Sequence, residues 1–279
     1  MSPSRLRASD LVAPTSGVRV HTAAQYEERC RAVLLALSPH AFLCGGAAAE
    51  LHGIPLPWRL GRPPQVEVAT PGPGRAVRRA GIVARSLVVF GDEVRLLRGI
   101  RLTSPARTWC DLARTLTVPE LVAAGDPLLV RGADLVDAAR RHPDRRLHAK
   151  LRTALDLLDT GSESPKESET RAVLQLGGLP RPRSNVPIFD GGRFLARVDL
   201  LYEEYGEVLE YQGDHHRTEV GQWRRDRGRI VRLEDTGLHV IEVTQLDLDD
   251  PAAFVARVAR TLARKGWAGA PQFSRWFPT

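Results

Sequence analysis

Helix-like and strand-like spacings of apolar residues alternate along the first half of the chain. The stretch 23–37 has the three-to-four-residue period of a helix. The alanine-rich stretch 45–52 predicts a second helix, which ends at Gly53. Proline and glycine bound three β-rich runs that predict a small sheet, namely 64–71, 81–89 and 99–104.

Helical patterns dominate the middle of the chain. Ser104 and Pro105 open a helix, because serine is favoured as an N-cap and proline at the first helical position. Further helices are predicted at 118–130, 133–141 and 147–159. The small polar residues of 160–166 indicate a domain boundary. The order beyond it, which is helix, hairpin, helix, strand and helix, is typical of an α/β domain.

The composition is that of a folded chain rather than a disordered one. Of the 279 residues, 43% are hydrophobic and 26% are charged, which suffices for two domains. The formal net charge of +7 permits a polyanion such as DNA as a partner. A genome of high GC content would enrich arginine in the same way.

Three widely spaced cysteines argue against both a disulfide framework and a zinc site. Cys30, Cys44 and Cys110 are odd in number and contain no CxxC pair. We therefore expect three buried thiols in a reducing compartment. Neither a secretory leader nor an apolar run of membrane-spanning length is apparent, so we expect a cytoplasmic protein without a membrane partner.

The strongest candidate for chemistry lies on a predicted hairpin. Two β-rich runs, RFLARVDLLY and EVLEYQ, flank the connection EEYG at 203–206. Counting outward from this connection places Asp199 opposite Glu210, with their Cβ atoms about 4.5–5.5 Å apart. Gln212 projects from the same face as Glu210. The opposite face is predicted to be an apolar stripe of Val198, Leu200, Tyr202, Leu209 and Tyr211.

Two opposed carboxylates repel each other unless something offsets their charge. Mg²⁺ does so, because it binds one or two carboxylates and retains several waters. Such a water can be activated to attack a phosphorus. The alternative is that both acids are solvated on an exposed face of the sheet, or paired with Arg197.

Asp199 and the triplet Glu210-Tyr211-Gln212 resemble the signature of the PD-(D/E)XK nucleases. The region 164–264 is similar to an endonuclease domain of actinobacterial proteins that is related to the very-short-patch repair nucleases. Six motifs carry this resemblance in order: SPKESETR, GLPRPRSNVPI, ARVDLLY, EYQGDHHRT, WRRDRGRI and GLHVIEVT. The resemblance implies a restriction-endonuclease-like α/β domain, with a mixed sheet flanked by helices, that binds Mg²⁺ or Mn²⁺.

By the same resemblance, Asp199, Glu210 and the backbone carbonyl of Tyr211 would hold the metal ion. Gln212 departs from the family pattern, which has lysine at this position. A neutral amide can orient an attacking water, but it lacks the charge with which lysine stabilises the reacting groups. This substitution puts the rate of catalysis, and catalysis itself, in question.

Glu167 and His216 are candidates for supporting roles. Related nucleases place a helix glutamate beside the metal, and Glu167 fits that position. Alternatively, Glu167 completes a capping box with Ser164 and pairs with Arg171. His216 titrates near neutrality and is a candidate for acid–base catalysis or a phosphate contact. Its alternative is a surface or capping histidine.

The helix predicted for 218–236 carries a basic stripe of Arg225, Arg229 and Arg232. A basic stripe beside a metal site would meet the phosphate backbone of DNA. The alternative is a solvated face on which the arginines pair with neighbouring acids.

The first half of the chain resembles another family. The motifs GGAAAELHGIPLP, LTSPARTWCDLA and LVAAGDPLL are similar to the middle region of the abortive-infection antitoxins of type IV toxin–antitoxin systems. We expect an arm and a helix over 1–40, an α+β antitoxin-like domain over 41–160 and the nuclease domain over 161–279. A toxin or another protein is a candidate partner of the first part, and no catalytic residue is expected before residue 160.

The leading hypothesis is a Mg²⁺-dependent DNA endonuclease that hydrolyses phosphodiester bonds, in DNA repair or in defence against phages and mobile elements. The rival hypothesis is a DNA-binding or antitoxin-like regulatory protein that has the nuclease fold without turnover. Gln212 favours the rival, whereas the opposed Asp199 and Glu210 favour the enzyme. An RNA nuclease is a third interpretation.

Overall fold

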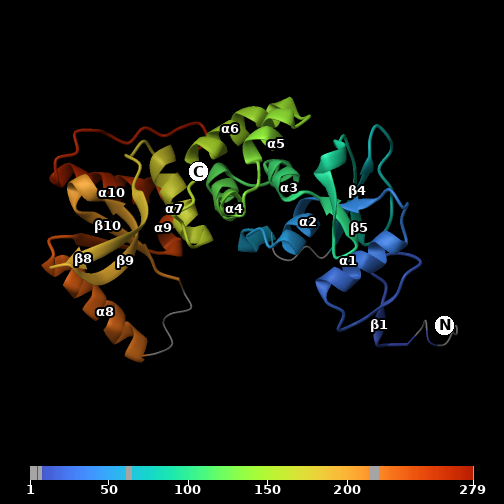
Figure 1. The fold of residues 1–279 in the computed structure, drawn as a ribbon, viewed down its shortest axis with the longest axis horizontal. Helices are drawn as coiled ribbons and strands as arrows, with labels where there is room; N and C mark the ends of the chain where they lie inside the picture. Colours follow the sequence, from blue (N-terminus) through green and yellow to red (C-terminus); the bar gives the residue numbers. More distant parts are fainter. Residues whose placement is uncertain (1–4, 6–7, 61–64, 214–219, 279) are drawn as a thin grey trace. The chain divides into compact units, whose positions relative to one another are not determined.

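The computed structural model describes residues 5, 8–60, 65–213 and 220–278, with the side chains of 220–227 outside that description (Figure 1). Its helices are α1 (Tyr26–Leu35), α2 (Gly45–His52), α3 (Pro105–Leu112), α4 (Val118–Val130), α5 (Leu135–Arg141), α6 (His148–Leu157), α7 (Pro165–Leu176), α8 (Val220–Asp235), α9 (Gln245–Asp249) and α10 (Pro251–Arg264). Its strands are β1 (Leu11–Val12), β2 (Val20–His21), β3 (Phe42–Leu43), β4 (Val66–Pro71), β5 (Ile82–Leu87), β6 (Val94–Leu97), β7 (Ile100–Thr103), β8 (Arg183–Asp190), β9 (Arg193–Tyr202), β10 (Glu207–Tyr211) and β11 (His239–Val243).

The chain folds into two compact units. The first unit comprises Met1–Thr115 and Arg131–Leu151, and the second comprises Leu116–Val130 and Arg152–Thr279. Helix α4 thus belongs to the second unit, although it precedes the stretch 160–166. No helix in the described ranges is both long and apolar enough to cross a membrane.

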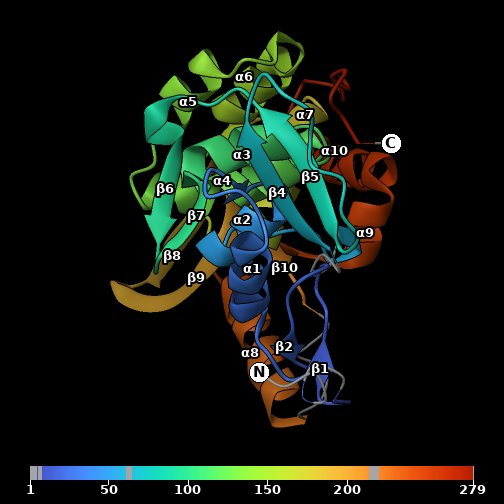
Figure 2. The ribbon, with the colours of Figure 1, turned by 90° about the vertical axis from the view of Figure 1, so that its right-hand side faces the viewer.

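The first unit is built on a mixed five-stranded sheet with the order β5-β4-β3-β7-β6. β4 and β5 run parallel and lie side by side in Figure 2, whereas β6 and β7 pair antiparallel. Helix α3 begins as predicted, because the Ser104 side chain accepts a hydrogen bond from the backbone N–H of Arg107. Helix α2 ends at Gly53, which adopts φ 62°. Strand β6 is an addition to the predicted sheet.

The cysteines are free and buried, as predicted: Cys30, Cys44 and Cys110. Loss of water raises the pKa of the Cys30 thiol to about 12. A buried thiol with a raised pKa is a poor nucleophile, so Cys30 has a packing role.

The second unit contains a four-stranded mixed sheet with the order β11-β10-β9-β8. β10 runs parallel to β11, whereas β9 pairs antiparallel with both β10 and β8. Buried residues of α7 and α10 pack on one side of the sheet, including Val173, Phe254 and Val258. Leu233 of α8 packs on the other side. This arrangement confirms the predicted mixed α/β character, with helices flanking a mixed sheet.

The predicted hairpin register is correct, but one assignment to its apolar stripe is wrong. Leu209 pairs with Leu200, as symmetric counting predicts. Leu200 belongs to the core formed with α7 and α10, whereas Val198 belongs to the core on the α8 side. Strict alternation along β9 therefore fails between these two residues. Asp199 lies between them, and the position opposite Asp199 on β8 is Asn185. The left-handed φ of 50° at Asn185 interrupts the regular ladder.

A buried ion pair joins α4 to α7 within the second unit. Arg171 donates to Asp126 at 2.7 Å, and both side chains are at most 2% exposed. Arg171 also donates to the carbonyl oxygen of Leu157. The predicted pairing of Arg171 with Glu167 is therefore wrong, because the guanidinium points toward α4.

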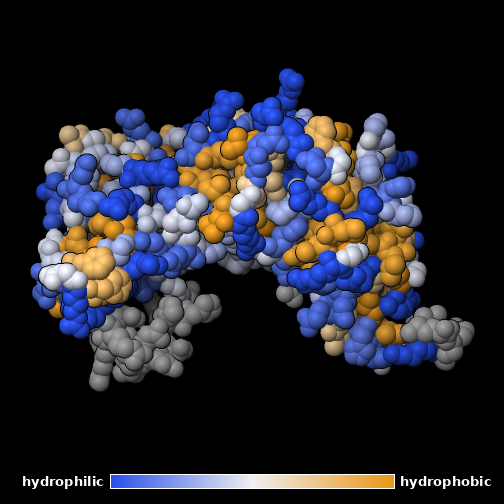
Figure 3. Space-filling view, viewed as in Figure 1, coloured by the Kyte–Doolittle hydropathy of each residue, from blue (hydrophilic) through white to orange (hydrophobic). Residues whose placement is uncertain are grey.

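Both hydrophilic and hydrophobic side chains reach the surface on the face shown in Figure 3. Phe189 and Phe194, near the turn between β8 and β9, remain more than half exposed, at 58% and 57%. Their rings contact each other edge to face, with centroids 5.9 Å apart. Scattered exposed apolar side chains are normal on a folded domain, and we assign no function to these two phenylalanines.

Candidate functional site

Asp199 lies where the ladder between β9 and β10 opens. The paired positions of these strands end with Leu200 and Leu209, one step before Asp199 and Glu210. At this step, Oδ2 of Asp199 accepts a hydrogen bond from the backbone N–H of Tyr211 at 2.8 Å. The side chain of one strand thus takes the place of a backbone acceptor, which fixes its carboxylate at the point where the strands part.

Burial dominates the electrostatics of Asp199. Loss of water raises the pKa of its carboxyl group to about 6. The negative charge of Glu167 raises the pKa further, whereas the N–H of Tyr211 and the charge of Arg229 lower it. A carboxyl group perturbed by both burial and a neighbouring acid is a candidate functional group.

Glu210 is buried, with only 3% of its side chain exposed. Its Oε2 accepts a hydrogen bond from the guanidinium of Arg229, which projects from α8. Its Oε1 is also buried and has no hydrogen-bond partner among the described residues. A buried polar atom without a partner costs about 1–3 kcal/mol. A ligand that contacts Oε1 would recover this free energy, so Oε1 is the most favourable point of this site for a further ligand.

Tyr211 and Gln212 complete β10 and continue beyond it. The ring of Tyr211 packs against the core formed with α7 and α10, and its hydroxyl donates to Gln245. The backbone N–H of Gln212 donates to the carbonyl of Val243 on β11 at 2.7 Å. Alternation along β10 places the side chain of Gln212 on the face of Glu210. The assignment of the Tyr211 carbonyl as a metal ligand stays a prediction.

Glu167 is held at the start of α7 by two donors. The side chain of Ser164 accepts from the N–H of Glu167 at 3.2 Å, which confirms the predicted N-cap. The Oε2 of Glu167 accepts from the N–H of Glu163 and from the side-chain amide of Asn185, both at 2.9 Å. In a capping box, the Glu167 carboxylate would accept from the backbone N–H of Ser164. Here it accepts from Glu163 and Asn185 instead. Because Glu167 raises the pKa of Asp199, the two carboxylates act on each other.

Asn185 and Glu163 are members of the site that the sequence analysis did not single out. Asn185 adopts φ 50°, a conformation that asparagine tolerates better than most residues. Its amide donates both to Glu167 and to the carbonyl of Gly161, the latter at 2.6 Å. Glu163 is paired with Arg197 at 2.6 Å. An asparagine within a strand-like run was the available signal for a local interruption.

The predicted basic stripe does not form one uniform surface. Arg229 contacts Glu210, whereas Arg232 is exposed and donates to the carbonyl of Gly228 in its own helix at 3.1 Å. The side chain of Arg225 lies outside the described residues, as does His216. Their predicted roles in DNA binding and proton transfer therefore stay predictions.

The acids are suited to a hard divalent cation, but only in part. Within the described ranges, no group of three or more histidines, cysteines, aspartates or glutamates is placed to hold a metal ion. Asp199 and Glu210 supply two carboxylates, one of which has an unpartnered buried oxygen. Mg²⁺ commonly binds through one or two carboxylates and keeps several waters. The donor set thus fits a cation whose remaining ligands are water or substrate.

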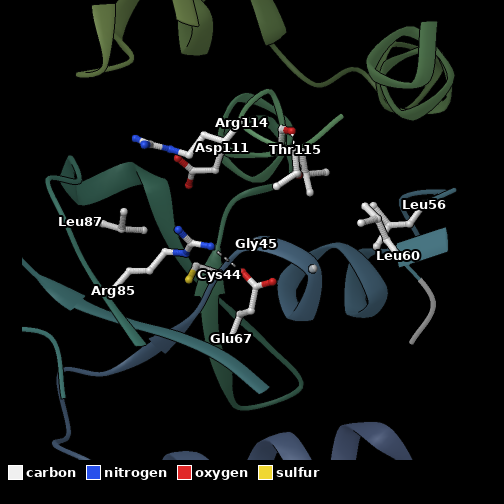
Figure 4. A pocket seen from close by; sticks show the side chains of 12 residues that line it. Cys44, Gly45, Leu56, Leu60, Glu67, Arg85, Leu87, Asp111, Arg114 and Thr115 are labelled. Atoms are coloured by element: carbon white, nitrogen blue, oxygen red, sulfur yellow. Dashed lines mark hydrogen bonds and ion pairs between the residues drawn. The ribbon is translucent and has the colours of Figure 1, made fainter. Parts of the chain in front are cut away.

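A cavity lined by charged side chains lies in the first unit, near the start of α2 (Figure 4). Glu67 and Arg85 face each other there, 3.8 Å apart. Burial raises the pKa of Glu67, and Arg85 opposes that rise. Gly45 adopts φ 54°, which disfavours other residues, and a Cβ at this position would also force the carboxylate of Glu67 to shift. The pocket neutralises its own charges, and no catalytic role is assigned to it.

Two proteins of Mycobacterium tuberculosis are similar to this chain over most of their length. They are "Uncharacterized protein MT2308" of strain CDC 1551 / Oshkosh and "Uncharacterized protein Rv2248" of strain ATCC 25618 / H37Rv. Each is 28% identical over 247 residues, which is 86% of this chain and 88% of the relative. No model of a protein family matches the chain, and no solved structure does. Neither name carries an activity that could be transferred.

Proposed function

We propose that the second unit is a restriction-endonuclease-like domain that hydrolyses phosphodiester bonds in DNA with the help of Mg²⁺ or Mn²⁺. The observation that carries this proposal is the buried Oε1 of Glu210, on the strand next to Asp199, to which no residue of the described ranges donates. The mixed α/β sheet and the order of motifs along it agree with the nuclease resemblance. A pair of acids where two strands part is a reasonable place for a reacting group.

Asp199 and Glu210 would hold the cation, with Glu167 close enough to Asp199 to perturb it. Bound there, the cation supplies activation of a water for attack on phosphorus and stabilisation of the charge that develops. The rest of the site is supplied by the chain. Tyr211 fixes one oxygen of Asp199 through its N–H, and Asn185 fixes Glu167 through its amide.

DNA is the proposed substrate because the charges suit it. The chain has a net charge of +7, and Arg232 exposes its guanidinium on the helix that packs over the site. Gln212 would orient a water or a phosphate oxygen through its amide. Without a lysine at this position, we expect slower turnover than in nucleases that have one.

The contact between Arg229 and Glu210 favours a second candidate function. A guanidinium already offsets the charge of Glu210, so the acids are tolerated without catalysis. A DNA-binding or antitoxin-like regulatory protein with a nuclease-type fold would retain this arrangement. Gln212 agrees with that alternative.

Cleavage of supercoiled plasmid with Mg²⁺ or Mn²⁺ separates the two functions. The wild-type protein should nick the plasmid, and Asp199→Asn should lower the rate by at least about 100-fold. Asp190→Asn, a matched change of an exposed acid in the same sheet, should leave the rate unchanged. A labelled single-stranded RNA included in the same assay identifies an RNA nuclease. Retarded but uncut DNA with every protein would establish the binding protein instead.

A further inference from the structure

We propose that Arg229 is a built-in counterion of the candidate site, which releases Glu210 to a divalent cation and then faces the anionic substrate. This inference rests on the proposed function, since it concerns the same two acids. It assigns to one side chain two successive partners: a carboxylate before the cation binds, and a phosphate afterwards.

The contacts of Arg229 place its charge where a cation would act. One guanidinium nitrogen donates to Oε2 of Glu210, and the other donates to the carbonyl of Arg197 on β9 at 3.3 Å. These contacts join β9 and β10 beside the two acids, and they place the positive charge of Arg229 against Glu210, where a bound cation would lie.

The geometry of the pair favours exchange over a permanent contact. The side chain of Arg229 is 31% exposed, whereas that of Glu210 is 3% exposed. The Arg229 side chain is therefore partly accessible to solvent, whereas the Glu210 side chain is almost fully enclosed. Arg229 satisfies only one oxygen of Glu210, and Oε1 has no partner in the part of the chain that the structure describes. A divalent cation would engage carboxylate oxygen more strongly and would repel the neighbouring guanidinium.

A released Arg229 remains on α8, beside the acids. Its planar guanidinium matches the geometry of a phosphate and binds it through two parallel hydrogen bonds. The predicted contact between Arg229 and DNA is therefore compatible with the structure only after Glu210 has gained another partner. Cation binding and phosphate binding are coupled through this one side chain.

Binding of Mn²⁺ in the absence of nucleic acid tests the inference without any activity. The free Mn²⁺ signal in electron paramagnetic resonance gives the dissociation constant for the full chain. Arg229→Gln removes the competing charge and should tighten Mn²⁺ binding about ten- to a hundredfold. Arg232→Gln is the matched control, because this arginine lies on the same helix and bonds to its own backbone. It should leave the dissociation constant unchanged.

The outcomes separate this inference from the proposed function. Equal Mn²⁺ affinity of the wild type and Arg229→Gln, with binding abolished by Glu210→Gln, would overturn the counterion role and leave the metal site standing. Absence of Mn²⁺ binding in every variant would overturn both.

A second measurement uses the wild-type protein, so it does not depend on the folding of Arg229→Gln. The side-chain Nε–Hε resonance of Arg229, assigned by its loss in Arg229→Lys, reports its partner. Saturation with Mg²⁺ should shift this resonance toward that of free arginine. A resonance that stays unchanged while Mg²⁺ binds would contradict the exchange.

Discussion

Two of the arginine–carboxylate pairs in the second unit, Arg171–Asp126 and Arg229–Glu210, differ in how completely they are enclosed. Arg171 and Asp126 are 0% and 2% exposed, and the second oxygen of Asp126 accepts from the N–H of Asp159 at 2.9 Å. Arg229 and Glu210 are 31% and 3% exposed, and within the described ranges the second oxygen of Glu210 has no partner. The first pair is closed and satisfied, and the second is half open and half satisfied.

This difference separates a structural ion pair from a reactive one. Burial raises the pKa of Asp126 and Arg171 opposes the rise, so the charges of the first pair depend on each other. Removing one partner of such a pair leaves the other charge buried and is strongly destabilising. In the second pair the arginine has access to water, so its removal leaves an opening for solvent or a cation. The contacts indicate that the first pair fastens α4 to α7, and that the second belongs to the site.

The largest expected effect is that of Arg171→Gln. The substitution leaves Asp126 buried without its counterion, so we expect a loss of about 3–5 kcal/mol in the free energy of unfolding. Urea denaturation followed by circular dichroism measures this loss. Arg152→Gln, which changes an exposed arginine in the same unit, should cost less than about 0.5 kcal/mol. A cost below about 1 kcal/mol for Arg171→Gln would show that the first pair is not the closed one.

The pH dependence of stability is expected to report Asp199. In the folded protein its pKa is about 6, above the ordinary 3.8, so the folded state holds the proton more tightly than the unfolded state. The resulting stability is present below pH 4 and is lost as the pH rises through 6. The full loss is about 3 kcal/mol. Urea midpoints between pH 4 and 7, measured with EDTA, should fall for the wild type.

The same pH series with two variants assigns this slope. Asp199→Asn should flatten it, because the amide does not titrate, whereas Asp190→Asn should retain it. If both variants kept the full slope, the titrating group would lie elsewhere, and the burial of Asp199 would have to be reconsidered.

The sequence predicts the features of the second unit that depend on residues close together in the chain. Counting from the turn at 203–206 gave the register that brings Asp199 and Glu210 to neighbouring strands, because residue numbers alone fix a symmetric hairpin. The N-cap at Ser164 is equally local, since it depends on residues within one turn of α7.

The sequence does not predict contacts between residues that are far apart in the chain. Asp126 and Arg171 are 45 residues apart, and no local pattern pairs them. The direction of Arg229 depends on how α8 packs on the sheet, so the sequence predicts only a surface stripe that contains it. The left-handed Asn185 interrupts β8, and Val198 of the neighbouring strand lies in the core on the α8 side.

Replacing the arginine of the second pair by glutamine tests how far the two pairs differ in their contribution to stability. Arg229→Gln should cost about 1–3 kcal/mol without metal, less than Arg171→Gln, because Glu210 gains access to water through the opening that the shortened side chain leaves. Thermal melts in EDTA measure this cost. Saturating Mn²⁺ should recover stability in Arg229→Gln and leave Arg171→Gln as it was. Equal costs in the two pairs, with no recovery by Mn²⁺, would erase the distinction between them.

The smallest expected effect concerns Asn185, which positions Glu167 near the second pair. Asn185→Gly keeps the left-handed backbone and removes the two amide hydrogen bonds, at a cost of about 1–2 kcal/mol. Asn185→Ala removes the same bonds and adds about 1 kcal/mol for a Cβ at φ 50°. Urea denaturation of both variants measures the difference between them, and equal costs would mean that the backbone at this position is not left-handed in solution. With its amide gone, Glu167 is free to move away from Asp199, so the pKa of Asp199 should fall and the slope between pH 4 and 6 should become shallower in Asn185→Gly than in the wild type.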